Sequence, residues 1–178
     1  FVVLLANRTG FNPDTVLGLS WSQVRESNWL YGDERWDIDP GGEEDRVTIV
    51  GKKGRSLRAQ VRSFPARVTT PTNPPVVLRK LKLVTSRLRP HAPPFFADRV
   101  FLFSLLNSQH RGVTGYGVGS DSLASDISWT RHLKSFIREN RLPAFTLKML
   151  RLTSSDLVDE VTGGDIIAKQ TILNHRDT

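Results

Sequence analysis

The pattern of apolar and polar positions predicts a chain that mixes helices with a small amount of β-structure. Near the N-terminus a turn at residues 9–14 precedes a helix. Asn12 suits the N-cap, and Pro13 suits the first helical position, where its missing N–H costs nothing. The apolar side chains that follow predict the buried face of this helix: Val16, Leu17 and Leu19, with Trp21 and Val24 beyond.

Two alternating segments predict a β-hairpin. Residues 46–50 are β-branched and alternate, residues 51–54 form a turn, and residues 56–64 alternate again. A polar, acidic connection at 31–45 precedes them and holds a short strand around 36–38. In the second hairpin strand, the alternation predicts an inner face of Leu57, Ala59, Val61 and Ser63 and a basic outer face of Arg58, Gln60 and Arg62.

Helical spacing continues after the breaker cluster at residues 71–75. It predicts a helix at 76–89, stopped by the prolines at 90–94. Residues 100–106 fit either a strand or a helix, and residues 112–120, with four glycines, predict a loop. In the helix at 76–89 the predicted inward positions are Val77, Leu81, Val84 and Leu88, and the outward cations are Arg79, Lys80, Lys82 and Arg87.

Three further helices are predicted towards the C-terminus. One starts at residue 121 or 122 and runs to about 140. The next is capped by Thr146 and ends at Gly163-Gly164, and the last spans about 166–173 behind Asp165. Their predicted core positions are Ile127, Leu133, Phe136 and Ile137, then Leu147, Leu150, Leu157 and Val158. The predicted fold is therefore mixed α+β: a single, mainly helical domain over residues 1–178, with a small antiparallel hairpin or sheet on one side.

Composition excludes several classes of protein. The 178 residues are 38% hydrophobic and 24% charged, which is typical of a globular chain. Cysteine is absent, so disulfide scaffolds, thiol nucleophiles and cysteine-bound metals are excluded. No apolar run approaches the roughly 20 residues of a membrane helix. We therefore expect no membrane partner and a cytoplasmic location.

The charge distribution points to a polyanion. Residues 46–97 carry 12 basic side chains and no acidic one, whereas the other 126 residues carry 13 basic and 18 acidic side chains. A charge run more often marks a solvated face, but such runs usually mix both signs. We therefore interpret the block as a footprint for nucleic acid.

Two cations lie three residues apart in the helix that follows Thr146. Lys148 and Arg151 project from one face of its first turns, where the helix dipole favours a phosphate group. The alternative is a pair of solvated surface charges. His175, 24 residues after Arg151, and Lys52 at the hairpin turn are equally ambiguous when taken alone.

Taken together, these features resemble the catalytic domain of the tyrosine recombinases, the phage integrase group. Residues 9–24 are similar to the family's first box, in which a Thr-Gly turn precedes a helix, an apolar Leu stretch and a Trp. The hairpin with Lys52 at its tip resembles the family's basic hairpin. Residues 146–153 resemble its His-x-x-Arg box, and Leu173-Asn174-His175 resembles its Leu-Gly-His element. The similarity covers nearly the whole chain in the right order, although every box carries a substitution.

The resemblance implies strand cleavage and rejoining on duplex DNA without a metal or cofactor. In this family a tyrosine forms a 3′-phosphotyrosyl intermediate, cationic side chains hold the non-bridging oxygens, and the hairpin lysine protonates the leaving 5′-oxygen. Carried over, Lys52 is the general acid and Lys53 its one-residue alternative. Lys148 stands where the family has His, Arg151 is the second arginine and His175 takes the His/Trp position.

The resemblance also implies partners and a setting. The cations expected on the DNA are Lys53, Arg55, Arg58, Arg62, Arg79 and Lys80. Family members assemble as tetramers on DNA, occur in prokaryotic or phage systems and carry a core-binding domain ahead of such a region. We accordingly expect a homo-oligomer on DNA.

Two departures keep a second function open. Asn12 occupies the position of the first-box arginine, and an amide cannot replace a permanently charged, bidentate guanidinium. Arg8 is close in sequence but lies before the turn, so we do not expect it to replace the first-box arginine. The family's nucleophile follows the His element by several residues, and we interpret Tyr31 and Tyr116 as loop residues, so the tyrosine either follows Thr178 or has been lost.

The alternative function is a DNA-binding protein of the same fold that acts in regulation or assembly without cleaving DNA. An unrelated RNA-binding domain would need aromatic residues between the basic strand positions, and Phe64 is the only one in the hairpin.

Overall fold

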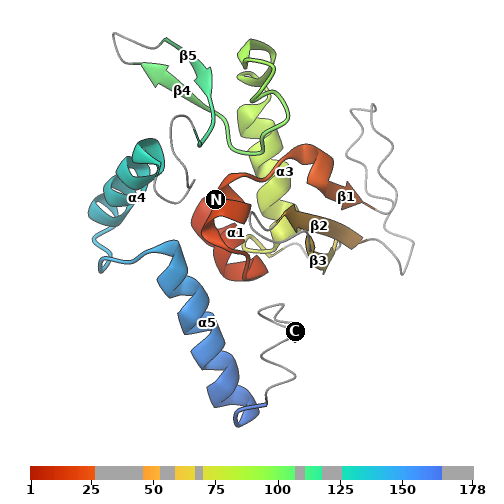
Figure 1. Cartoon of the computed structure of the whole chain (residues 1–178), viewed down its shortest axis with the longest axis vertical. Coiled ribbons are helices and arrows are strands. Elements are labelled where there is room, and N and C mark those ends of the chain that lie inside the picture. The colour runs from red at the N-terminus through yellow and green to blue at the C-terminus, as the bar shows by residue number, and fades with distance from the viewer. Residues whose placement is uncertain (27–45, 53–58, 67–69, 107–110, 118–125, 166–178) are drawn as a thin grey trace.

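The protein is represented by a computed structural model that describes residues 1–26, 46–52, 59–66, 70–106, 111–117 and 126–165 (Figure 1). Its elements, in chain order, are α1 (Val2–Thr9), α2 (Pro13–Leu17), the 3-10 turn η1 (Trp21–Gln23), β1 (Val24–Glu26), β2 (Arg46–Lys52), β3 (Ala59–Pro65), α3 (Pro74–Thr85), the 3-10 turn η2 (Arg89–His91), β4 (Phe103–Leu106), β5 (Arg111–Thr114), α4 (Ile127–Glu139) and α5 (Leu147–Thr162). The prediction of a mixed α+β fold with a small antiparallel sheet is confirmed.

Strands β1, β2 and β3 form an antiparallel sheet in that order, and β4 and β5 form a separate antiparallel pair. Strand β2 pairs with β3 from Arg46 opposite Pro65 to Lys52 opposite Ala59, so the predicted hairpin is confirmed. Its tip at 53–58 and the predicted strand at 36–38 lie outside the described residues. The pairing of β4 with β5 resolves residues 103–106 as a strand and corrects the predicted loop over 112–114.

The predicted faces of the second hairpin strand are reversed in the structure. Gln60 is only 5% exposed, whereas Val61 is 49% exposed. The reason lies in the partner strand, where Val47 and Ile49 are buried and therefore define the inner face. Ile49 lies opposite Arg62, and residues opposite each other share one face of a sheet. Arg62 consequently belongs to the inner face and not to a free basic surface.

The main core is built around α1, which the sequence pattern did not predict. Its buried residues Val2, Leu5 and Ala6 join a hydrophobic cluster that extends from α2 and the sheet to α3, α4 and α5. Figure 1 shows α1 near the middle of the molecule, with the hairpin on one side and α4 and α5 on the other. Helix α1 thus links the segments that carry the candidate site.

Helix α2 and helix α3 differ from the pattern at their ends. Helix α2 ends at Leu17 and the chain turns into η1, so Val24 lies in strand β1 and not on a helical face. Helix α3 begins at Pro74 and ends at Thr85, and Val84, predicted to face inward, is exposed. Thr85 in the same turn is buried, so Val84 lies on the solvent side of the last turn of α3.

Helices α4 and α5 keep only part of their predicted core faces. Helix α4 starts at Ile127 behind Asp126, whose carboxylate accepts a hydrogen bond from Trp129 N, and Ile127 is 77% exposed. Leu133 is buried as predicted, and Trp129 is buried instead of Ile127 and Phe136. Helix α5 begins after Thr146 and ends before Gly163 and Gly164, as predicted. Leu147 is buried, but Leu157 is exposed.

Within the described part of the chain, no helix is both long enough and apolar enough to cross a membrane.

Candidate nucleic-acid interface

Asn12 occupies the predicted N-cap of α2, with Pro13 at the first helical position. The carbonyl oxygen of Asn12 accepts the first helical hydrogen bond, from Val16 N at 3.1 Å. An N-cap Asn usually accepts a hydrogen bond from a backbone N–H of the first turn, here Asp14 or Thr15, but the Asn12 side chain makes no such capping bond. The backbone conformation, fixed in part by Pro13, therefore starts the helix without help from the Asn12 amide.

The first box and the hairpin lie directly against each other. A Cβ atom on Gly51 would come within 2.5 Å of Thr15 Cγ2 and 3.2 Å of Phe11 Cε2, so only glycine permits the observed approach. On the next strand, Arg62 Nε donates to the carbonyl oxygen of Thr9 at 2.9 Å. These contacts place the end of β2, where Lys52 pairs with Ala59, beside the first box.

The start of α5, where residues 146–153 resemble the His-x-x-Arg box, lies on the side of α1 away from the hairpin (Figure 1). Leu147 is buried in the main core and Leu150 packs against that core, so the first turns of α5 are held against α1. Lys148 is exposed in the first turn of α5. The backbone of Arg151 belongs to α5, but its side chain lies outside the described residues, as does the side chain of Lys52.

The structure therefore brings the first box together with the hairpin, and α1, which adjoins the first box, also contacts α5. His175, Lys53, Arg55 and Arg58, together with the predicted helix at 166–173, lie outside the described residues. The convergence of Lys52, Lys148, Arg151 and His175 on one surface stays a prediction.

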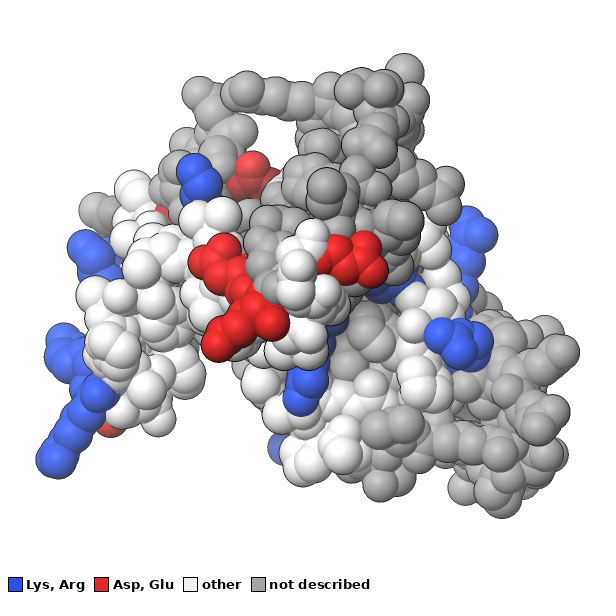
Figure 2. Space-filling model, turned by 90° about the horizontal axis from the view of Figure 1, so that it is seen from below, with Lys and Arg blue, Asp and Glu red and all other residues white. Residues whose placement is uncertain are grey.

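Charges along α5 run against the helix dipole. A helix favours acidic groups near its N-terminus and basic groups near its C-terminus. Helix α5 has no acidic residue in its first turn and no basic residue in its last, whereas Lys148 lies at the start and Asp156 and Glu160 are exposed further on. Figure 2 shows acidic side chains near the middle of the molecular face seen from below. This arrangement is therefore unfavourable for the stability of the helix itself.

The basic block of residues 46–97 is partly structural. Arg46 Nε donates to Ser63 Oγ at 2.8 Å, and Arg62 is tied to α1 as described above. The cationic groups of Lys82 and Arg89 lie 5.9 and 5.6 Å from the centre of the Trp21 ring. Two other members of the block, Lys80 and Arg87, are exposed on the surface, and Arg79 is half-buried.

Tyr116 is buried in a cluster of aromatic side chains. Its ring packs against the rings of Phe103 and Trp129, and its hydroxyl lies 3.2 Å from His132 Nδ1. Burial and the nearby Asp126 carboxylate raise the pKa of Tyr116 well above its ordinary value. Tyr116 lies in a bend after β5, as expected for a loop residue, and its ring is part of the aromatic cluster.

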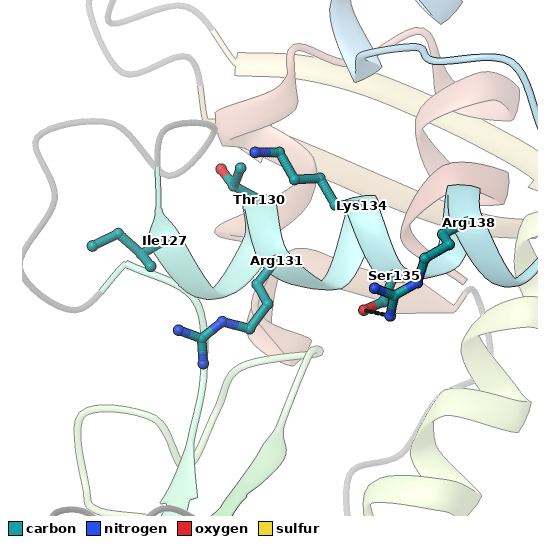
Figure 3. A pocket seen from close by; sticks show the side chains of 6 residues that line it. All are labelled: Ile127, Thr130, Arg131, Lys134, Ser135 and Arg138. Carbon is teal, nitrogen blue, oxygen red and sulfur yellow. Dashed lines mark hydrogen bonds between the residues drawn. The ribbon is translucent and has the colours of Figure 1, made fainter.

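Sequence reasoning missed a cationic hollow along α4. It has a volume of about 580 Å³, and its described lining comes entirely from that helix (Figure 3): Ile127, Thr130, Arg131, Lys134, Ser135 and Arg138. The signal was present as basic residues spaced at i, i+3 and i+7.

Comparisons of the chain with models of known protein families, with curated proteins and with solved structures found no match. Among the described residues, no group of three or more His, Asp or Glu side chains is arranged to hold a metal ion.

Proposed function

We propose that this chain binds duplex DNA and holds a phosphodiester group at the first turn of α5, as the catalytic domain of a tyrosine recombinase does. The observation that carries the proposal is the packing of the first box. Residues 9–15 contact the hairpin through Gly51 and Arg62, and the adjoining helix α1 contacts α5. The first box thus contacts the hairpin directly, and α1 lies between this pair and α5.

In the proposed site the chemistry belongs to cations. Lys148 and Arg151 stabilise the non-bridging oxygens of the phosphate, with His175 completing the set. Lys52 protonates the leaving 5′-oxygen, and Lys53 is its alternative. The exposed position of Lys148 in a helical first turn without an acidic residue supports this assignment, because nothing within that turn neutralises the ammonium group.

A second candidate function is DNA binding without strand cleavage, and Asn12 favours it. The residue at this position lies at a helix start and carries no charge, so the site has one guanidinium group fewer than the family's. A protein of this kind would use the same surface for regulation or assembly on DNA.

One experiment separates the two candidates. The full-length protein is incubated with a nicked DNA duplex and analysed on a denaturing gel for a covalent protein–DNA adduct. An adduct that disappears in the Lys148→Ala, Arg151→Ala variant supports the recombinase. Binding without an adduct supports the second candidate, and absence of DNA binding contradicts both.

A further inference from the structure

Three cations of α4 form one exposed stripe. Arg131, Lys134 and Arg138 are all exposed and follow one another at three and four residues, so their backbone positions lie on one side of the helix, from which the side chains of Arg131 and Lys134 spread towards its two edges. From the first to the last they extend over roughly 10 Å at the helical rise. Glu139 is the acidic residue of this helix, and its position after Arg138 places it off the stripe.

The cations of this stripe differ from three cations of the basic block that are engaged within the fold. Arg62 is bound to a backbone carbonyl group, and Lys82 and Arg89 lie over Trp21. By contrast, no described residue forms an ion pair with Arg131 or Lys134. Arg138 makes a long hydrogen bond of 3.5 Å to Ser135, drawn as a dashed line in Figure 3. Within the described part of the chain, the stripe is therefore a set of exposed cations that an external anion can reach.

The position of α4 fixes which side it presents to a partner. Trp129 and Leu133 are buried and anchor the helix to the main core. In Figure 3, Arg131 and Lys134 point towards opposite edges of the helix. The hollow between them is lined by polar and cationic side chains, with Ile127 at one end. A partner that binds here meets the exposed cations of a helix that Trp129 and Leu133 attach to the core.

The chemistry of the stripe favours a phosphate backbone over a lipid surface. Membrane-surface helices insert a continuous apolar face beside their basic residues, whereas the main apolar face of α4 is occupied by the core. Guanidinium groups bind phosphate oxygens in a bidentate manner, and a series of spaced cations matches the regular charges of a nucleic-acid strand.

We propose that the stripe Arg131, Lys134 and Arg138 on α4 is a second contact surface for the phosphate backbone of duplex DNA, separate from the site at α5. This inference rests on the proposed function, because it concerns the same partner. It assigns to α4 a sequence-independent positioning role: the stripe holds the duplex, and the α5 site engages one phosphodiester group.

The test uses the full chain and a fluorescently labelled duplex of random sequence, with affinity measured against salt concentration. The Arg131→Ala, Lys134→Ala, Arg138→Ala variant should lose at least about tenfold in affinity at low salt and flatten the slope of log K against log salt by about 2 to 3. The matched control, Arg131→Lys with Arg138→Lys, keeps the three charges and should keep the slope. Circular dichroism shows whether each variant is folded.

The outcomes separate this inference from the proposed function. Wild-type DNA binding that depends on Lys148 but is unchanged in the α4 variant overturns the inference and leaves the proposed function standing. DNA binding that is lost only in the α4 variant supports the stripe and contradicts the α5 site. Vesicles of anionic phospholipid and polyglutamate are tested in parallel. Binding to either that depends on the stripe, with unchanged DNA binding, assigns the surface to that other partner and overturns the inference.

Discussion

Gly51 sets the distance between the hairpin and the first box. The contact with Thr15 Cγ2 leaves no room for a methyl group, and Thr15 is itself buried in the short helix α2. A β-branched side chain in a helix has few rotamers, so Thr15 cannot simply turn away.

We predict that Gly51→Ala lowers the free energy of unfolding by about 1 to 3 kcal/mol through overpacking. The matched variant adds Thr15→Ser, which removes the Cγ2 methyl group that the new Cβ atom would meet. Chemical denaturation should show a smaller effect of Gly51→Ala in the Thr15→Ser background than in the wild-type background. Equal effects in both would show that the contact is not what excludes a larger residue.

His132 gives the stability of the protein a dependence on pH. Burial and the nearby Arg131 charge lower the pKa of His132 below its ordinary value of 6.5, although Asp126 acts in the opposite direction. As the pH falls below 6.5, the unfolded chain binds a proton before the folded chain does. This contribution to stability is therefore complete above pH 6.5 and is lost as the pH falls through the lowered folded pKa.

We predict that the wild type loses more stability than the His132→Gln variant when the pH is lowered from 7.5 to 5. Thermal unfolding over this range measures the difference, which is expected to be small because the ring is partly exposed. Identical pH profiles for the two proteins would contradict the lowered pKa.

At the scale of elements, β3 shows what a single strand's sequence leaves undetermined. Alternation predicts two faces but does not say which one is inside. The choice is made by Val47 and Ile49 on the partner strand, which bury one face and carry Arg62 with them. Helix α1 was missed for a related reason. Its apolar run hides the spacing of Val2, Leu5 and Ala6, and a continuous apolar run fits a helix or a strand equally well.

Arg62 connects two elements, because its guanidinium group donates to the carbonyl oxygen of Thr9, the last residue of α1, where the helix dipole favours a cation. We predict that Arg62→Ala lowers the free energy of unfolding by about 1 kcal/mol, the lower range for a charge-assisted hydrogen bond at a partly exposed position. Lys80→Ala, which removes an exposed charge of the same block, should leave the stability within about 0.5 kcal/mol of wild type.

Urea denaturation of the two variants measures both effects. If Arg62→Ala were as stable as Lys80→Ala, the interaction with Thr9 would contribute nothing, and Arg62 would be free to serve as the DNA contact that the sequence predicts.

For the whole molecule, the sequence was sufficient to predict those helices and strands whose ends are marked by capping or turn residues. The hairpin and both ends of α5, marked by Thr146 and by Gly163-Gly164, follow directly from residue types. Exposure was harder to predict, because it depends on which elements reach each position. Leu157 fits the apolar stripe of α5 but lies beyond the turns that pack against α1.

In the candidate site too, local features were visible in the sequence, whereas contacts between distant segments were not. The order of the boxes and the role of Pro13 in starting α2 were visible in the sequence. That Lys82 and Arg89 stack on Trp21 was not, because it requires η1 and α3 to come together from distant parts of the chain. The stripe on α4 was overlooked because Ile127 and Phe136 were assigned to the core. A basic block in a sequence is therefore a weaker guide to a DNA footprint than exposed cations in the fold.

The measurement that tests the central claim most directly is the affinity for duplex DNA as a function of salt concentration, for the wild type and the Lys148→Ala, Arg151→Ala variant. The account predicts a linear fall of log K with log salt for the wild type and a slope shallower by about 2 in the variant, since each lost phosphate contact removes about 0.9. A wild type that does not bind duplex DNA, or a variant with the wild-type slope and affinity, would contradict a phosphate site at the first turn of α5.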